Sequence, residues 1–161
     1  MKDQIPVVLE AKVLTVSESV HAGTREDRSG AVLTERLQAA GFAVVGRAVV
    51  PDGVQPVAAG IVDMCRGFAG LVVTTGGTGF APNDLTPEAT ESVLDRRAST
   101  LATAMQLSDP KGRLSRGVAG TVGGALVINL PGSPAGALEC LNAVIDVVPH
   151  ALDLMAGGHP H

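Results

Sequence analysis

The stretch "GLVVTTGGTGFAPNDLTPEAT", residues 70–90, contains the clearest structural signals of the chain. Its first six residues form a short run that is apolar on every side, as in a strand covered on both faces in a parallel sheet. The glycine-rich segment 76–79 ends this run, and a helix follows with Thr86 as its cap and Pro87 at its first position. We therefore expect a strand, a loop with little side-chain bulk and a helix in immediate succession.

Strand and helix patterns alternate along the rest of the chain. The expected strands cover residues 7–17, 42–50, 70–75 and 125–130, the last of them joined to a hairpin centred on 121–124. The expected helices cover residues 28–41, 54–68, 96–109 and 134–148, besides the one that opens at Thr86. Asp52 and Ser133 stand where the caps of two of these helices belong, and Pro149 bends or ends the last one. This alternation predicts an α/β protein, a three-layer αβα sandwich on a mostly parallel sheet, as one domain over residues 1–161.

Composition excludes several classes of function. The chain of 161 residues has a net charge of −4, three Phe and no Trp or Tyr, so a nucleic-acid surface is not expected. No apolar run approaches the roughly 20 residues that span a bilayer, and the first residues lack a secretory cleavage pattern. Cys65 and Cys140 lie far apart and are interpreted as buried free thiols. We expect a soluble cytoplasmic protein.

Three polar segments follow expected strands: residues 17–30, 76–84 and 130–134. Because the carboxyl ends of parallel strands meet at one edge of a sheet, these loops should share one rim, where α/β proteins bind ligands. The "GGTG" of residues 76–79 is a turn or a phosphate-binding loop, and it matches neither the Walker A motif nor the dinucleotide fingerprint. Asp52 and Asp84 are either helix-start residues or carboxylate ligands for Mg²⁺ beside bound phosphates.

Two further segments belong to the same expected rim. Ser133, after Gly132 in "LPGSP", caps a helix and can also present free amides to an anion. Ser115 and Arg116 are either a solvated pair or a hydroxyl and a positive charge for the same ligand.

Several motifs together resemble a known family. "VSESVHAGTREDRSG", "VVPD", "GGTGFAPNDLTPEAT", "LSR" and "INLPGSP" followed by "ECL" occur in the order seen in MogA- and MoaB-type proteins of molybdenum cofactor biosynthesis and in the G domains of gephyrin and Cnx proteins. The resemblance implies the molybdopterin-binding fold, a homotrimer and molybdopterin adenylyltransferase activity. Molybdopterin and ATP, with Mg²⁺, would give adenylyl-molybdopterin and pyrophosphate, and a molybdate-inserting MoeA-type protein would receive the product.

The resemblance also implies which residues form the site. By motif position, Asp52 and Asp84 match the two functional aspartates, which hold Mg²⁺. The positions that match substrate or nucleotide contacts are Ser17, Asp27, Ser29, Gly30, Gly76, Gly77, Thr78, Gly79, Ser115, Gly132 and Ser133. The chain departs from the family pattern at Glu18, Gly53 and Asn83, and Asn83 replaces an arginine that offers a phosphate contact.

Two other functions remain open from the sequence. One is a trimeric molybdopterin-binding or scaffold protein of MoaB type that does not catalyse a reaction, against which the intact pair of aspartates argues. The other is a nucleotide pyrophosphatase of the CinA type, which shares the fold but which the "LPGSP" and "ECL" motifs disfavour.

Overall fold

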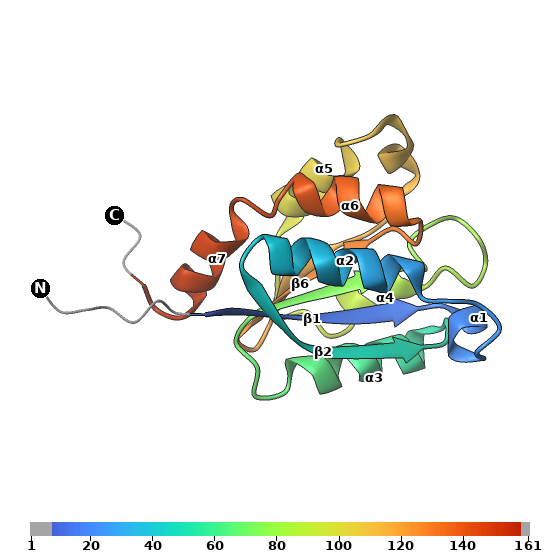
Figure 1. Cartoon of the computed structure of the whole chain (residues 1–161), viewed down its shortest axis with the longest axis horizontal. Coiled ribbons are helices and arrows are strands. Elements are labelled where there is room, and N and C mark those ends of the chain that lie inside the picture. Colours follow the sequence, from blue (N-terminus) through green and yellow to red (C-terminus); the bar gives the residue numbers. More distant parts are fainter. Residues whose placement is uncertain (1–7, 159–161) are drawn as a thin grey trace, which may run out of the picture.

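The computed structural model describes residues 8–158 and contains a six-stranded sheet with helices on both faces (Figure 1). The strands are β1 (Leu9–Val16), β2 (Phe42–Val50), β3 (Leu71–Thr75), β4 (Arg96–Arg97), β5 (Ala119–Val122) and β6 (Ala125–Leu130). The helices are α1 (Glu18–His21), α2 (Arg28–Ala39), α3 (Val54–Cys65), α4 (Thr86–Glu91), α5 (Ser99–Gln106), the 3-10 helix η1 (Pro110–Leu114), α6 (Pro134–Asn142) and α7 (Val148–Met155). All four expected strands are present; residue 7, the expected start of the first, lies outside the described residues.

The strand order is β2-β1-β3-β6-β5-β4. Neighbouring strands from β2 to β6 are parallel, whereas the hairpin β5–β6 and the short pair β4–β5 are antiparallel. The chain leaves β1 for β2 on one side and returns through α3 to β3 on the other side. Neighbouring strands whose connections leave in opposite directions form the crevice where open α/β sheets bind ligands, here at the carboxyl ends of β1 and β3.

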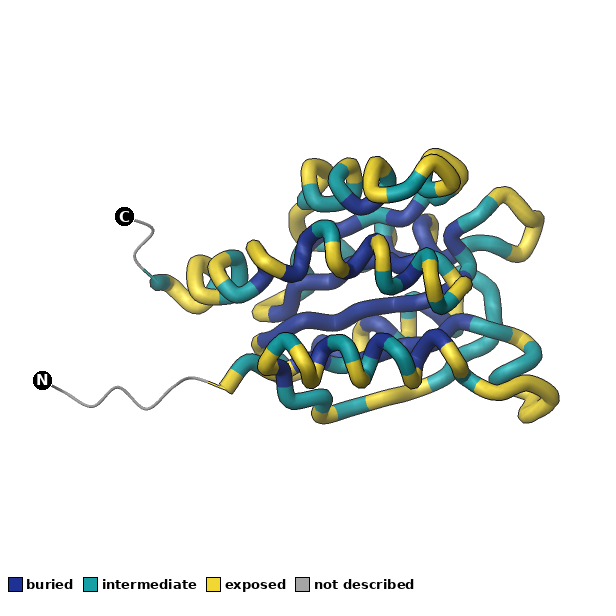
Figure 2. Tube along the Cα trace, turned by 45° about the horizontal axis from the view of Figure 1, so that its top comes forward, coloured by how far each residue is buried: buried dark blue, intermediate teal, exposed yellow. Residues whose placement is uncertain are grey.

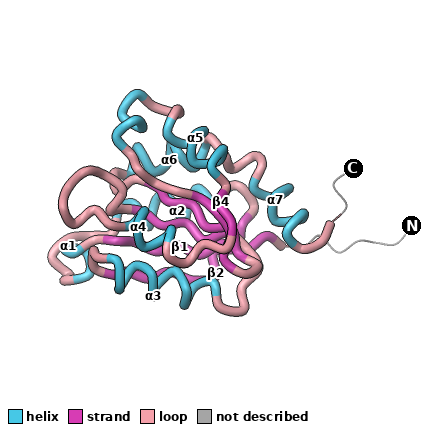
Figure 3. The backbone as a smooth tube through the Cα atoms, turned by 180° about the vertical axis from the view of Figure 1, so that it is seen from behind, coloured by secondary structure: helices cyan, strands magenta, loops and turns pink. Residues whose placement is uncertain are grey.

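Two apolar cores sandwich the sheet, because successive residues of a strand point to opposite faces. In β3, Leu71 and Val73 pack into the core beneath α2, α5 and α6, and Val72 packs into the core beneath α3 and α4. The central strands β3 and β6 are buried along their whole length, dark blue in Figure 2, whereas the outer strand β2 is partly exposed. Figure 3 shows α3 and α4 on the second face. The expected three-layer arrangement with a mostly parallel sheet is confirmed.

Three expected helices have different bounds, the first of which, expected at 54–68, ends already at Cys65. The helix expected at 96–109 begins only at Ser99, because Arg96 and Arg97 pair with β5 as a two-residue strand. The helix expected at 134–148 ends at Asn142, and Pro149 lies in the first turn of a new helix, α7, instead of ending the old one. The apolar residues predicted to share one helix face do pack together, since Leu141, Ile145 and Val148 belong to the same core although α6 and α7 are separate helices.

Two expected caps are wrong. Gly53, and not Asp52, is the residue before α3, and it makes no side-chain cap bond. Leu85 precedes α4, so Thr86 is the first helical residue, and its hydroxyl bonds outside the helix. Ser133 does cap α6, since its Oγ accepts a hydrogen bond of 3.1 Å from the backbone N–H of Gly136. Neither Asp52 nor Thr86 caps a helix with its side chain. Both side chains are therefore available for other contacts at the carboxyl ends of the strands.

The cysteines are buried free thiols, as expected. Burial raises the pKa of Cys65 to about 11 and raises the pKa of Cys140 as well, which keeps both thiols protonated at neutral pH.

Candidate ligand-binding site

The loops that leave the parallel strands gather at one edge of the sheet, the right-hand edge in Figure 1 beside α1. Two adjoining cavities open there, a larger one of about 640 Å³ and a smaller one of about 420 Å³. They share four lining residues: Gly77, Asp84, Gly132 and Ser133. The expected convergence of the three loops on one rim is therefore confirmed.

The loop of residues 76–79 has all four of its carbonyl groups bonded within the protein. Thr86 donates to the first two, through its hydroxyl (2.9 Å) and its backbone N–H (3.0 Å). Arg116 donates to the last two, through its backbone N–H (2.8 Å) and its Nε (2.8 Å). The N–H of a planar trans peptide points away from the carbonyl of the same peptide, so the N–H groups of residues 77–80 face away from these partners.

These four N–H groups have no acceptor within residues 8–158. Residues 77, 78 and 79 line the larger cavity. Consecutive backbone N–H groups that face a hollow form a concave site for an anion. The loop thus has the arrangement of a phosphate-binding site, made by main-chain atoms alone.

Two glycines of this loop have no substitute. Gly77 has a φ of +68°, and a Cβ there would collide with the hydroxyl of Thr86 and approach a carboxylate oxygen of Asp52 to 3.3 Å. Gly76 has a φ of +107°, and a Cβ would collide with the carbonyl of Val16 at the end of β1. Close approach of two strand ends, together with positive φ, explains why glycine is needed.

Asp52 and Asp84 both line the smaller cavity, beside Gly76 and Gly77. The pKa of Asp52 is raised, first by burial of its carboxyl group and then by the charges of Glu18 and Asp84, while the backbone N–H of Glu18 opposes the rise. Asp84 Oδ2 accepts a hydrogen bond of 2.9 Å from the backbone N–H of Ala81, which fixes the carboxylate inside its loop. Two carboxylates that repel each other in a partly buried site favour a shared cation.

No group of three or more His, Cys, Asp or Glu side chains able to hold a metal ion occurs in the described part of the chain. A complete protein cage is therefore not offered by residues 8–158. Mg²⁺, however, is commonly bound by one or two carboxylates together with substrate phosphates and water. The pair Asp52 and Asp84 next to an anion loop fits that ligand set.

Three predicted site residues of the segment 17–30, namely Ser17, Asp27 and Ser29, also lie at the rim, but their side chains have structural partners. Asp27 caps α2 through the N–H of Gly30 (2.9 Å) and accepts hydrogen bonds from Thr15 Oγ1 (2.9 Å) and Arg47 (3.1 Å). Asp27 still lines the smaller cavity, whereas Gly30 lines neither cavity.

Two serines of the same segment also line the smaller cavity. Ser29 donates to the carbonyl of Gly132 at 2.5 Å and so joins α2 to the "LPGSP" loop. Ser17 caps α1 by accepting from the N–H of Val20 (3.3 Å). Both hydroxyls therefore already have structural partners.

The other predicted contacts divide between the cavities. Thr78, Gly79 and Ser115 line the larger cavity, and Gly132 and Ser133 line both. Ser115 Oγ accepts a hydrogen bond of 3.2 Å from the backbone N–H of Gly117. Ser115 reaches the rim because β5 runs antiparallel to β6, which brings the residues before β5 to the carboxyl end of β6.

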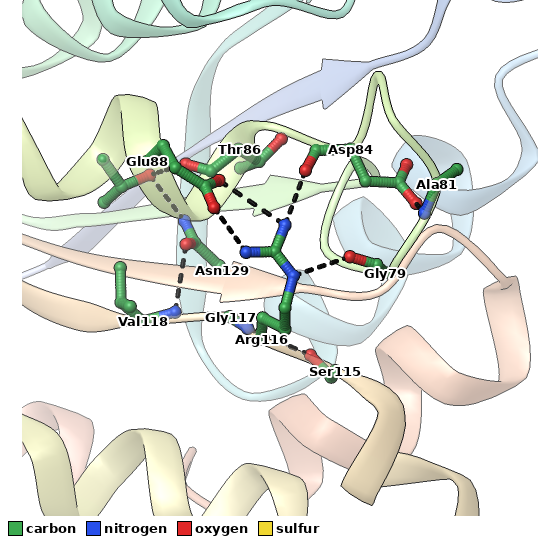
Figure 4. A network of polar contacts seen from close by, with 11 residues as sticks. Gly79, Ala81, Asp84, Thr86, Glu88, Ser115, Arg116, Gly117, Val118 and Asn129 are labelled. Carbon is green, nitrogen blue, oxygen red and sulfur yellow. Dashed lines mark hydrogen bonds and ion pairs between the residues drawn. The ribbon is translucent and has the colours of Figure 1, made fainter.

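The basic residues that line the two cavities are not the arginine that the sequence suggested. Arg116 lines neither cavity, because its guanidinium is bonded to Gly79, Asp84 and Glu88 (Figure 4). Three basic residues that were not predicted from the motifs do line the cavities: Arg25, Arg28 and Lys111. The presence of two arginines in a segment already assigned to the rim was the signal that could have found the first two. They supply cations to a site in which Asn83 replaces an arginine of the family pattern.

None of the helices in the part of the chain that the structure describes is long and apolar enough to cross a membrane.

Comparison with known proteins identifies the family of the chain. Residues 12–150 match the model of a family described as a probable molybdopterin binding domain. The chain is 36% identical to the molybdopterin adenylyltransferase of Helicobacter pylori over 154 residues, which cover 91% of this chain and 88% of that protein. It is also 36% identical to the molybdenum cofactor synthesis protein cinnamon of Drosophila melanogaster over 89% of its own length. It spans only 25% of that protein, and 49% of a molybdenum cofactor biosynthesis bifunctional protein of Chlorobaculum tepidum.

The solved structure of the molybdopterin biosynthesis enzyme MoaB from Thermus thermophilus is 41% identical, with a TM-score of 0.86 over 95% of this chain and 99% of that chain. A family model that covers most of the chain, and relatives this close in sequence and fold, agree with the motifs at the rim. The chain belongs to the probable molybdopterin binding domain family, with the MogA- and MoaB-type proteins of molybdenum cofactor biosynthesis.

Proposed function

We propose that this protein is a molybdopterin adenylyltransferase, which transfers AMP from ATP to molybdopterin and releases pyrophosphate. The observation that carries the proposal is the loop of residues 76–79, whose bonded carbonyls leave a row of N–H groups free beside two carboxylates. Two adjoining cavities that share this loop suit a reaction between two substrates. A relative named for this activity supports the same assignment.

The reaction requires alignment and charge neutralisation more than proton transfer. The terminal phosphate of molybdopterin is already a nucleophilic anion, so no general base has to create the attacking group. An oxygen of that phosphate attacks the α-phosphorus of ATP, a new P–O–P bond forms, and the bond to pyrophosphate breaks. The N–H groups of residues 77–80 would hold one phosphate in line, and Arg25 and Arg28 would attract the other phosphates to the smaller cavity.

Asp52 and Asp84 would hold Mg²⁺ together with substrate phosphate oxygens. The ion, when bound, neutralises the negative charge on the phosphates and on the departing pyrophosphate. The raised pKa of Asp52 fits this role, because a carboxylate destabilised by burial and by its neighbours gains most from a cation. The adenylylated product would then pass to a molybdate-inserting protein of the MoeA type in the cytoplasm.

The test is an assay of the purified protein with molybdopterin, ATP and Mg²⁺, in which pyrophosphate release and adenylyl-molybdopterin are measured. Asp84→Asn keeps an oxygen for the N–H of Ala81 but removes the charge, so we expect turnover to fall by at least about 100-fold while the protein stays folded. Asp63→Ala, on the exposed side of α3, is the matched control and should retain full activity. Binding of molybdopterin without pyrophosphate release by the wild type would refute the proposal and favour the scaffold function.

A further inference from the structure

We propose that Arg116 is a positioning residue, which holds the anion loop and Asp84 in the conformation that binds phosphate and metal without touching the substrates itself. The inference rests on the proposed function for its catalytic consequence. Its structural content, an ordered loop between β3 and α4, is independent of the substrate.

Arg116 connects both ends of that loop (Figure 4). Its backbone N–H and Nε donate to the carbonyls of Thr78 and Gly79, both at 2.8 Å. Its Nη2 donates to the backbone carbonyl of Asp84 at 2.6 Å. One side chain therefore joins the anion-binding end of the loop to the residue that carries the metal-binding carboxylate.

The positive charge of Arg116 is paired within the protein. Its Nη1 forms an ion pair with Glu88 in the first turn of α4, and its Nη2 lies 3.5 Å from the second oxygen of the same carboxylate. The hydrogen bond that Arg116 donates to the carboxylate of Glu88 lowers the pKa of Glu88 and raises the pKa of Arg116, so both stay charged at neutral pH. The guanidinium carbon also lies 5.9 Å from the ring centre of Phe80, the residue after the glycines.

These contacts exclude a direct role in substrate binding. All three guanidinium nitrogens have protein acceptors, and Arg116 lines neither cavity. The planar fork of an arginine can reach three acceptors in fixed directions, whereas the ammonium group of a lysine is a single compact charge on a flexible stem. A lysine at position 116 would therefore keep the charge but could not bridge both ends of the loop.

The test compares Arg116→Gln and Arg116→Lys with Arg97→Gln in the full chain. Arg97 is the matched control because it pairs at 2.8 Å with Glu91, a second acid of the same helix, but contacts no loop carbonyl. Three quantities are measured: hydrogen exchange of the backbone N–H groups of Asp84 and Thr86, binding of Mg²⁺-pyrophosphate, and adenylyl transfer. The two N–H groups are bonded within the loop to Ala81 and Gly77, so their exchange reports loop order.

We expect exchange at both N–H groups to rise about tenfold or more in each Arg116 variant, since a lost charge-assisted hydrogen bond shifts a local equilibrium by at least that factor. Pyrophosphate binding should weaken about tenfold, and kcat/KM should fall about 100-fold in Arg116→Gln and in Arg116→Lys alike. Arg97→Gln should match the wild type in all three measurements.

Rescue of pyrophosphate binding and turnover by Arg116→Lys would overturn the proposal, because charge alone would then suffice. Unchanged exchange, or increased exchange with full turnover, would also overturn it. If the wild type makes no adenylyl-molybdopterin, the proposed function fails, and exchange together with pyrophosphate binding still decides the role of Arg116.

Discussion

Gly77 both makes the turn that ends β3 and shapes the anion-binding loop. Its positive φ turns the chain out of β3, and its missing side chain leaves room for Thr86, whose hydroxyl and N–H bind the loop carbonyls. A turn and an anion site are thus not alternatives here. The same backbone conformation that ends the strand directs the N–H groups outward.

Gly77→Ala should therefore cost more than the strain of its backbone angle. Gly123→Ala is the matched control, since Gly123 also has a positive φ (+56°) but no atom within 4 Å of the added Cβ. Both changes should lower the free energy of unfolding by about 1–2 kcal/mol, because alanine is strained in the left-handed conformation. Gly77→Ala should lower Tm further, because Thr86 is displaced, and should abolish pyrophosphate binding. Equal losses of Tm in the two variants would show that the collision is relieved at no cost.

The carboxyl group of Asp52 is expected to lower the stability of the protein at neutral pH while it serves activity. Its raised pKa means that the folded chain binds the proton more tightly than the unfolded chain. That contribution to stability is complete below the ordinary value of 3.8 and is lost as the pH rises through the raised pKa. Asp52→Asn should hence raise Tm at pH 7 without Mg²⁺, with a difference that shrinks toward pH 4, and should remove turnover. Thermal melts from pH 4 to 8 check this, and a lower Tm at pH 7 would contradict it.

Among the secondary-structure elements, the helices that begin at the rim show two different uses of a polar residue near a helix start: it caps the helix, or it contributes to the candidate site. Ser133 serves α6 as its cap and also lines both cavities. Asp52 and Thr86 stand in similar positions but cap nothing. Caps and ligand contacts use the same residue types beside the same free N–H groups, so the sequence pattern alone does not separate them.

Ser133→Ala should cost about 1 kcal/mol, or about 2–4 °C in Tm, because the N–H of Gly136 loses its acceptor. Ser99→Ala is the control: Ser99 opens α5, whose preceding residue, Ala98, provides no side-chain cap. That variant should melt within about 1 °C of the wild type. If Ser133 also contacts a substrate, its variant raises KM in addition, and an unchanged Tm would show that water replaces the cap.

At the scale of the whole molecule, the rim combines segments that are distant in the sequence. The antiparallel hairpin β5–β6 carries Arg116 to the loop after β3, 37 residues away from its acceptor Gly79. Ser29 reaches Gly132 across 103 residues. The site therefore combines residues from Thr15 to Cys140, which only the folded sheet brings together.

The homotrimer implied by the resemblance is a prediction at this scale. Large apolar side chains stay exposed on a single chain, among them Val8, Val45 and Leu107, at 66%, 50% and 72%. Burial of part of this surface between copies would favour association. Light scattering after size exclusion should give three times the 16.3 kDa of one chain, unchanged on tenfold dilution. A mass of 16.3 kDa at micromolar concentration would rule the trimer out.

The layers, the parallel strands and the rim were predictable from local features of the chain. Buried apolar runs such as residues 71–75, glycines after strands and a serine cap at Ser133 are local signals, because strands and helix ends are made by neighbouring backbone atoms. The sequence also placed Asp52 and Asp84 at one edge, which follows from parallel strands alone.

The role of each polar group at the rim, in contrast, follows from long-range packing. The tertiary structure assigned Thr86 to the loop carbonyls, divided the last predicted helix at residues 143–147, and turned Arg116 from a candidate ligand contact into a bridge across the loop. These outcomes depend on which distant acceptor lies within about 3 Å of a donor. Hydrogen bonds of that kind are short-ranged and directional, so only the packed chain fixes them.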